Sequence, residues 1–397
     1  MRIVRTGAMA AGVLLAFPAL AGNEEVERSF ASWLTPKERV GRHLFFDTNL
    51  STPPGQACAT CHAPGEAFTD PDQRFPTSQG VHKNLFGKRN APTAMYSAFS
   101  PAFHFDEQEV GYIGGQFLDG RAATLEEQAK QPFLNPLEMA NADKRAVVES
   151  VRRAAYAKLF RRVFGPDALD DVDQAYDRIA DAIAAFERTG TFNRFTSKYD
   201  HYLAGKVSLT AQELNGLKVF EDPARGNCAA CHPSRPADDG TPPLFTDFSY
   251  DNLGVPKNPY NPFYGLPATF NPDGRSFVDF GLGAAVNLRS EDGKFKVPTL
   301  RNIAITAPYM HNGYFQTLRG VVEFYSTRDT RPQCRNAFTP EAQALQQHCW
   351  PAAEVGDNVN REELGRLGLT AQEIEDLLAF LHTLTDGYAP PSRPGKH

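Results

Sequence analysis

A five-residue pattern that occurs twice places the strongest constraint on this chain. Residues 58–62 read Cys-Ala-Thr-Cys-His, and residues 228–232 read Cys-Ala-Ala-Cys-His. Cys-x-x-Cys-His is the attachment signature of c-type haem, because two thiols three positions apart can bond to both vinyl groups of one porphyrin. The adjacent imidazole then reaches one face of the iron. The pattern predicts two covalently bound haem c groups, held by Cys58, Cys61 and His62 and by Cys228, Cys231 and His232.

A zinc site or a disulfide is the alternative interpretation of paired cysteines. Paired Cys-x-x-Cys zinc sites usually have a short spacer, whereas more than a hundred residues separate the two pairs here. Zinc also leaves unexplained why a histidine follows both pairs. The haem interpretation is therefore preferred, with His62 and His232 as the proximal iron ligands.

The N-terminus has the parts of a secretory leader. Arg2 and Arg5 precede a stretch of small and apolar residues, which ends in Ala-Leu-Ala at residues 19–21. A retained membrane anchor is the alternative, but the apolar stretch is short for a span and Pro18 interrupts its end. We predict a signal peptide over residues 1–21 and an exported, periplasmic protein. No later segment reaches transmembrane length, so no membrane span is expected.

Charge narrows the choice of partners. The full sequence has 41 basic and 47 acidic residues, a formal charge of −6. Removing the leader takes away two arginines and no acidic residue, so the mature chain has 39 basic residues and a formal charge of −8. This balance excludes nucleic acid as an expected partner. It favours docking to a basic or neutral electron carrier.

Cys334 and Cys349 remain after the haem motifs have used four of the six cysteines. A leftover pair in an exported protein is typical of a disulfide. No neighbouring Cys-x-x-Cys spacing supports a redox or metal role for this pair. The sequence therefore predicts a structural disulfide near the C-terminus.

Each haem motif lies within a longer internal repeat. Residues 35–47 align in one register with residues 210–222, and both segments begin with a Thr that is followed by Glu three positions later. That spacing is a capping box, and apolar residues follow it at helical intervals. Each half also closes on an amphipathic helix, the first ending near Gly190 and the second running from the capping box at Thr370 to near Gly387. The repeat predicts a mainly α fold.

The repeat predicts two cytochrome c-like domains, each built around one covalently bound c-type haem. We place the N-terminal haem domain at residues 22–205 and the C-terminal haem domain at residues 206–397. A further helix is predicted over residues 147–164, with its four arginines on a solvated face. Residues 238–283 are rich in Pro, Gly, Asn and aromatic residues, and we expect an ordered loop around a haem edge with short strands possible.

The group opposite each proximal histidine decides what a haem does. Two strong axial ligands make an electron carrier, whereas an open face can bind peroxide. Peroxide cleavage needs a group that moves a proton between the two oxygens, which suits a carboxylate. An amide can hold the peroxide by hydrogen bonds. Glu138 and Gln128 lie in a Pro-broken segment and are candidates for these roles. From the residues alone, ordinary loop positions remain the alternative.

Further motifs accompany the haem motifs in a fixed order. They are Gly-x-x-Leu-Phe-Phe-Asp at 41–47, Arg-Asn-Ala-Pro-Thr at 89–93, Asp-Gly-Arg at 119–121, Val-Pro-Thr-Leu-Arg-Asn at 297–302 and Thr-Ala-Pro-Tyr-Met-His-Asn-Gly at 306–313. With these motifs in this order, the chain resembles the bacterial dihaem cytochrome c peroxidase and MauG family over nearly all of its mature length.

The resemblance implies that the haem ligated by His62 is the peroxide site. Gln128 and Glu138 would lie in its distal pocket, and Pro132 would shape that pocket. His82 precedes the Arg-Asn-Ala-Pro-Thr motif by seven residues, where some peroxidases place a loop histidine that caps this iron until the other haem is reduced. A solvated loop histidine is the alternative.

The resemblance also implies one calcium ion between the domains. The side chain of Asn90 and the backbone carbonyls of Thr306 and Pro308 would hold it, and waters would complete an oxygen shell that suits calcium.

The second haem, ligated by His232, is the electron-transfer centre in the family. Its other ligand is a Met in the peroxidases, and the matching position here is Tyr325, as in MauG-like members. Met310 is the alternative ligand. One residue departs from the family pattern, because Leu118 stands where members usually have a Trp between the haems.

Three functions are compared. The first is a periplasmic dihaem peroxidase, in which a small cytochrome c or cupredoxin reduces the C-terminal haem and hydrogen peroxide is reduced to water at the N-terminal haem. The second is a MauG-like enzyme that uses peroxide to oxidise side chains of a partner protein, which Tyr325 favours and Leu118 disfavours. The third is a non-catalytic dihaem electron-transfer cytochrome. Family members often form dimers, so a homodimer stays open.

Overall fold

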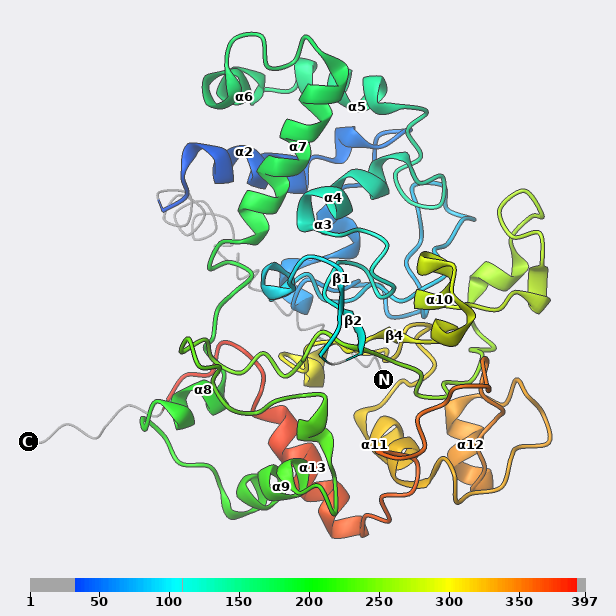
Figure 1. The fold of residues 1–397 in the computed structure, drawn as a ribbon. Coiled ribbons are helices and arrows are strands. Elements are labelled where there is room, and N and C mark those ends of the chain that lie inside the picture. The colour runs from blue at the N-terminus through cyan, green and yellow to red at the C-terminus, as the bar shows by residue number, and fades with distance from the viewer. Residues whose placement is uncertain (1–32, 109, 391–397) are drawn as a thin grey trace, which may run out of the picture.

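The computed structural model describes residues 33–108 and 110–390, which fold into two helical lobes (Figure 1). The leader predicted over residues 1–21 lies outside the described residues. Among the helices of the described part, none is long and apolar enough to cross a membrane. The prediction of a mainly α fold is confirmed.

The first half of the chain supplies the upper lobe in Figure 1, and the second half supplies the lower lobe. The α-helices are α2 (Pro36–Phe46), α3 (Cys58–Cys61), α4 (Leu125–Leu134), α5 (Lys144–Arg153), α6 (Ala157–Phe164), α7 (Val172–Glu187), α8 (Lys198–Leu203), α9 (Ala211–Glu221), α10 (Leu282–Val286), α11 (Leu318–Thr327), α12 (Glu341–Gln347) and α13 (Ala371–His382).

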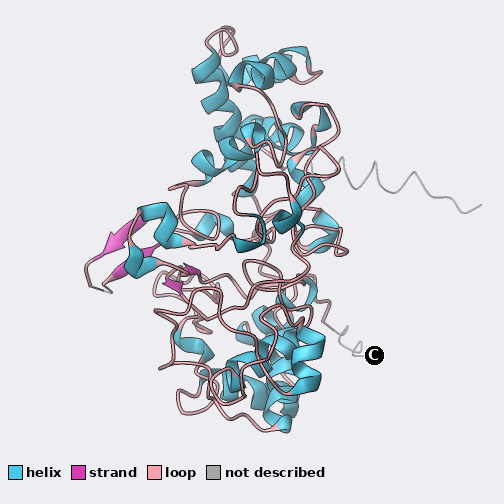
Figure 2. Cartoon of the chain, turned by 90° about the vertical axis from the view of Figure 1, so that its right-hand side faces the viewer, coloured by secondary structure: helices cyan, strands magenta, loops and turns pink. Residues whose placement is uncertain are grey.

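Two short antiparallel strand pairs lie at the level where the lobes meet, and one of them projects from the side of the molecule (Figure 2). Strand β1 (His104–Asp106) pairs with β2 (Gly111–Ile113), and β3 (Tyr250–Asp251) pairs with β4 (Phe295–Lys296). Loops make up much of the region between the helices in both views. The fold is therefore two helical cores with a loop-rich layer between them.

The predicted capping boxes begin three of the principal helices. Thr35, Thr210 and Thr370 each accept a hydrogen bond from the backbone of the Glu three residues later, whose carboxylate bonds back to the threonine N–H. These reciprocal bonds satisfy backbone donors that a helix start leaves free. The capping boxes at the starts of α2, α9 and α13 are confirmed.

The internal repeat extends to the way the helices pack. A Cβ built on Gly41 of α2 would lie 1.8 Å from the carbonyl oxygen of Ala182 in α7. A Cβ built on Gly216 of α9 would lie 1.9 Å from the carbonyl oxygen of Asp376 in α13. In each half the helix before the haem motif thus approaches the closing helix so closely that only glycine fits at the crossing.

Each lobe has its own aromatic core. In the first, Phe45 of α2 meets Phe186 of α7 edge-on, at 5.7 Å between ring centroids. In the second, Phe220 of α9 meets Phe380 of α13 in the same way at 5.2 Å. Tyr199 of α8 packs in the second core, so α8 contacts the C-terminal half although it precedes residue 206.

The prediction of a single helix over residues 147–164 is wrong. The chain forms α5 and α6 instead, and Ala154 between them is extended, with ψ 149°. The reason lies in the buried faces: Val151 and Phe160 are both fully buried, yet nine positions put them about half a turn apart on one helix. A break lets both face the core.

The solvated arginine face predicted for this helix is also incomplete. Arg152 does not point freely into solvent, because its Nε donates to the carbonyl of Leu169 at 2.9 Å and its Nη1 pairs with Glu149.

Residues 238–283 are ordered, as predicted, and contain strand β3. Buried asparagine side chains replace secondary structure as the source of order. The amide of Asn258 donates to the carbonyls of Asn312 and Gly313, and the amide of Asn261 donates to that of Lys88. These bonds satisfy backbone oxygens that a loop would otherwise bury unpaired.

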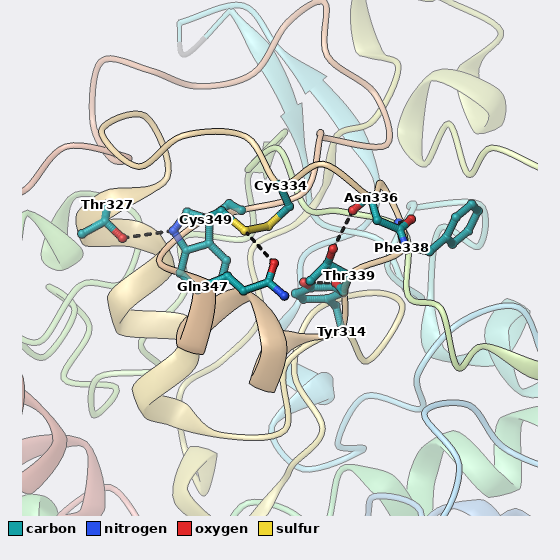
Figure 3. Close-up of a disulfide and its surroundings, with 9 residues drawn as sticks. Tyr314, Thr327, Cys334, Asn336, Phe338, Thr339, Gln347 and Cys349 are labelled. Atoms are coloured by element: carbon teal, nitrogen blue, oxygen red, sulfur yellow. Dashed lines mark hydrogen bonds between the residues drawn. A yellow bond between two sulfur atoms is a disulfide. The ribbon is translucent and has the colours of Figure 1, made fainter.

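The disulfide predicted between Cys334 and Cys349 is confirmed (Figure 3). It joins the loop before α12 to the residue pair that follows that helix, and both sulfurs lie in a core cluster with Trp350. The indole N–H of Trp350 donates to the hydroxyl of Thr327 at the end of α11. The disulfide therefore fixes the α11–α12 corner.

Replacing Gly41 by Ala tests the close helix crossing. We expect Gly41→Ala to destabilise the protein by about 2 kcal/mol or more, because the new methyl group overlaps a backbone carbonyl that cannot move alone. Urea unfolding of the purified protein measures this. Gly190→Ala is the matched control, since a Cβ there meets nothing within 4 Å. Equal stability of the two variants would contradict the packing described here.

Candidate functional site

The two motif histidines are oriented in the same way. His62 Nδ1 lies 2.9 Å from the carbonyl oxygen of Phe68, and His232 Nδ1 lies 2.7 Å from that of Phe245. Both phenylalanines are fully buried and have positive φ, 56° and 54°. A carbonyl at Nδ1 keeps the proton there and leaves Nε2 free as a metal ligand. This geometry fits an imidazole that ligates haem iron.

A second repeated feature supports these carbonyls. The hydroxyl of Thr93 donates to the carbonyl of Ala67, and the hydroxyl of Thr299 donates to that of Leu244. Each acceptor lies directly before the phenylalanine that holds a histidine. The sequence analysis treated the segments around Pro92-Thr93 and Pro298-Thr299 as separate motifs. Because a Pro-Thr pair follows each haem motif, their equivalence could have been recognised from the sequence.

A cavity of about 310 Å³ surrounds the second motif. Cys228, Cys231 and His232 line it from one side, and both candidate axial ligands, Met310 and Tyr325, line it as well. Burial raises the pKa of the Tyr325 hydroxyl far above its usual range, and the two thiols raise it further. The site therefore fits a haem, and both candidate ligands share its cavity.

Glu138 lies beside the first motif. Burial raises the pKa of its carboxyl group, while Arg121 and a hydrogen bond from Asn135 Nδ2 at 2.7 Å oppose the shift. Its charge also raises the pKa of Cys58 and Cys61 slightly, after burial and the larger effects of Glu187 on Cys58 and of Asp70 on Cys61. A buried carboxyl group with a raised pKa keeps its proton to a higher pH than an exposed one.

Gln128 and Pro132 lie one turn apart on α4, and Pro132 is inside that helix. Both side chains are partly buried. The helix begins at Thr124, whose hydroxyl accepts from the backbone of Glu127. Residues four apart share a helix face, so the structure brings Gln128 and Pro132 to one side of α4.

The His82 side chain is exposed. Its loop nevertheless packs on the segment that carries Glu138, because Val81 N–H donates to the Glu138 carbonyl at 2.8 Å and Gly80 leaves no room for a Cβ beside the Leu137 carbonyl. His82 therefore lies in a loop that borders the first site, and within residues 33–108 and 110–390 its ring forms no hydrogen bond or ion pair.

Asn90 reaches across to the second half of the chain. Its Nδ2 lies 2.6 Å from the carbonyl oxygen of Pro308, and its backbone N–H donates to His311. Thr306 lines the same cavity. A rotation of the amide would point its oxygen at that carbonyl, which requires a cation between them. The donor set is thus one of neutral oxygens, which suits calcium.

Comparison with known proteins identifies the family. Residues 35–208 match the family model described as dihaem cytochrome c peroxidase. The methylamine utilization protein MauG of Paracoccus denitrificans is 41% identical over 356 residues, which are 87% of this chain and 88% of that protein. The chain belongs to the dihaem cytochrome c peroxidase and MauG family. The cytochrome c551 peroxidase of Nitrosomonas europaea is 36% identical, covering 77% of this chain and 77% of that protein.

A solved structure agrees with this placement. The dihaem peroxidase BthA of Burkholderia thailandensis superposes with a TM-score of 0.73 at 34% identity, over 88% of this chain and 86% of that one. The family is one of dihaem oxidoreductases, so two haems are implied for this chain. Relatives include both a MauG and cytochrome c peroxidases.

A buried ion cluster between the lobes was missed by sequence reasoning. Arg89 of the Arg-Asn-Ala-Pro-Thr motif pairs with Asp119 of the first half and with Asp279 of the second, both at 2.6 Å. All three side chains are less than a tenth exposed. Burial would raise the pKa of both carboxyl groups, but the Arg89 guanidinium outweighs it and holds each pKa below its usual range.

Removing Arg89 tests this cluster. Arg89→Ala removes the cation that the two buried carboxylates share and leaves Asp119 with Arg121 at 2.8 Å and Asp279 with Lys88 at 3.9 Å. We expect a loss of about 3 kcal/mol in the free energy of unfolding at neutral pH. The loss shrinks in acid, because stability from depressed carboxyl pKa values is lost as pH falls through those values.

Denaturant unfolding at two pH values measures both effects. Arg74→Ala is the control, because its ion pair with Asp72 lies at the surface and is worth about 0–1 kcal/mol. A loss for Arg89→Ala no larger than the control's would contradict the interpretation of the cluster.

Proposed function

We propose that this chain is an exported dihaem peroxidase that reduces hydrogen peroxide to water with electrons from a small cytochrome c or cupredoxin. The observation that carries the proposal is the raised pKa of the Glu138 carboxyl beside the first haem motif, since peroxide cleavage needs a carboxyl that both accepts and returns a proton. Export to the periplasm after removal of residues 1–21 is part of the proposal, as are the haem domains at residues 22–205 and 206–397.

Cys58, Cys61 and His62 would hold the first haem, whose iron supplies an open face that binds peroxide. His62 would ligate the iron, and its bond to the Phe68 carbonyl keeps the ring in place. Glu138 would take a proton from one oxygen of peroxide and give it to the other, which leaves as water; two electrons from the donor protein and two protons from solvent would reduce the remaining oxygen to a second water.

Gln128 holds the peroxide by hydrogen bonds from its amide, and Pro132 shapes the pocket by interrupting the hydrogen-bond ladder of α4.

Electrons would enter at the second site. Cys228, Cys231 and His232 would hold that haem, and Tyr325 would be its second protein ligand, with Met310 as the alternative. A phenolate stabilises ferric iron, so Tyr325 would give a lower reduction potential than a Met ligand. The net charge of −8 expected for the mature chain favours a basic or neutral donor.

A calcium ion between the lobes is proposed at Asn90, Thr306 and Pro308. The contact between the Asn90 amide and the Pro308 carbonyl supports it, because the ion would bind the same two groups through their oxygens. A homodimer also remains a proposal.

A MauG-like function is the second candidate. Tyr325 and the 41% identity to MauG support oxidation of side chains on a partner protein, whereas Leu118 at the cavity wall offers no oxidisable ring between the sites. A non-catalytic dihaem cytochrome is the third, and would need His82 or another group as a permanent cap on the first iron.

Replacing Glu138 tests the leading proposal. We expect Glu138→Gln to keep both haems and to lose peroxide turnover by about 10²- to 10⁴-fold, the usual contribution of a proton-transfer group. The measurement is peroxide-dependent oxidation of a reduced small cytochrome c. Glu127→Gln is the matched control, since the Glu127 carboxylate is exposed on helix α4, which precedes the segment that carries Glu138. Retained turnover in Glu138→Gln would count against the role of Glu138.

The wild-type protein separates the three candidates in the same assay. Fast turnover supports the peroxidase, and turnover only from half-reduced protein indicates that His82 caps the first iron. Slow turnover with peroxide still consumed favours the MauG-like function. An absence of cyanide binding at both haems favours the non-catalytic cytochrome.

Matched variants of the two candidate ligands test the second site. We expect Tyr325→Phe to change the visible spectrum of the second haem and to raise its reduction potential, because the phenolate is lost. Met310→Leu should leave both unchanged. The reverse pattern would make Met310 the ligand.

A further inference from the structure

Glu187 is a buried carboxyl group that the proposed peroxide chemistry does not use. It is the last residue of α7 and is only 7% exposed. Within the described part of the chain, no hydrogen bond to its carboxylate is present, although its backbone carbonyl accepts from Asn193. A carboxyl group that lies inside a core without such bonds is costly to ionise, so its place in the fold needs an explanation.

The internal repeat supplies its position. A Cβ on Gly41 would lie 2.8 Å from the Cβ of Phe186, and a Cβ on Gly216 would lie 2.8 Å from that of Phe380. Phe186 and Phe380 are therefore equivalent, and so are the residues that follow them, Glu187 and Leu381. Leu381 lines the cavity around the second haem motif. Glu187 thus holds, at the first haem motif, the position that an apolar residue holds at the second.

Charge effects agree with this position. After burial, Glu187 has the largest effect on the pKa of the Cys58 thiol, which it raises. The carboxyl group is therefore close to the cysteine that would attach the first haem.

Few charged groups act on Glu187 itself. Burial raises its pKa to about 8, Arg188 on the same helix lowers it, and Glu126 from α4 raises it. Glu126 is itself paired with Arg188 at 2.6 Å, so the two largely cancel.

The helices that pack on α7 bring apolar side chains to its buried face, while Lys37 of α2, Lys130 of α4 and Lys144 of α5 form partly exposed ion pairs with Asp181, Asp177 and Asp173 of α7. Leu44 and Phe45 of α2 and Val147, Val148 and Val151 of α5 belong to the same buried cluster as α7.

Asp70 acts electrostatically on Cys61 and His62, and Glu138 acts more weakly on the two thiols. Glu187 is the carboxyl group with the largest such effect on Cys58.

We propose that Glu187 is a positioning residue of the first haem, which takes up one proton from solvent when that haem accepts one electron from the donor protein, and so sets its reduction potential. The added electron disfavours a nearby carboxylate, and the proton neutralises it. The inference rests on the proposed attachment of a haem at Cys58, Cys61 and His62, and it does not depend on whether peroxide or a partner protein is the substrate.

The sign of the pH dependence follows from linkage. At low pH Glu187 is protonated in both oxidation states, and the potential is independent of its titration. As pH rises through the range around 8, the oxidised site releases the proton first, so the potential falls. At high pH the carboxylate is ionised in both states and stabilises ferric iron, which leaves a lower plateau.

Redox titration of the holoprotein from about pH 6 to about pH 10 tests the proposal. Electron paramagnetic resonance at each potential follows the two ferric haems separately. Glu187→Gln removes the charge at constant size. We expect its first-haem potential to match wild type at low pH, to stay level as pH rises, and to lie above wild type at high pH. The second haem, next to Leu381, should be unaffected in the same molecule.

Two further variants secure the result. Asp181→Asn removes a carboxylate of the same helix that pairs with Lys37 at the surface, and it should keep the wild-type pH profile. Glu187→Leu installs the residue of the second site and should behave as Glu187→Gln.

An unchanged fall of potential with pH in both Glu187 variants would overturn the proposal, as would a level wild-type profile. Failure of the peroxidase proposal would appear instead as lost turnover with this pH profile intact.

Discussion

Each haem site depends on one hydrogen bond, from the Nδ1 of the motif histidine to the carbonyl of a buried phenylalanine. Cysteines on a short segment can attach a porphyrin in many poses, but only a fixed imidazole directs Nε2 at the iron. The left-handed backbone at Phe68 and Phe245 turns their carbonyls toward the rings. The Pro-Thr segments hold the preceding peptide, and the glycine helix crossings hold the phenylalanines in their cores. The two halves therefore hold the motif histidine in the same way.

Features that depend on residues close together in the sequence were predictable, and features that depend on how distant segments pack were not. The capping box at Thr35 needs only residues three positions apart, and the disulfide at Cys334 needs only a count of cysteines. The break after α5 depends on which way Val151 and Phe160 face, which a helical pattern alone does not fix. The candidate site divides in the same way: the motifs name Glu138, but its raised pKa comes from burial that only the folded chain supplies.

The two halves share one scaffold and differ in a few side chains around it, which fits the different tasks proposed for them. The first site has carboxyl groups at Glu138 and Glu187, and the second has Tyr325 and Leu381 in a cavity that is mostly apolar but is also lined by Asp251, Asp279 and Lys296. Titratable groups are therefore present at both sites. The carboxyl group of Glu187 in place of the apolar Leu381 is the structural counterpart of the proposed division of labour between the haems.

A buried ion cluster also joins the two halves of the chain. Arg89 bridges Asp119 of one half and Asp279 of the other in a region where all three are shielded from water. Separating the halves would leave these buried ions unpaired until water entered. Breaking this buried cluster therefore costs more free energy than breaking an ion pair at the surface. Electron transfer between two haems depends on their distance, and a hinge at this interface would change it. The ion cluster therefore stabilises the interface between the halves that carry the two haem motifs.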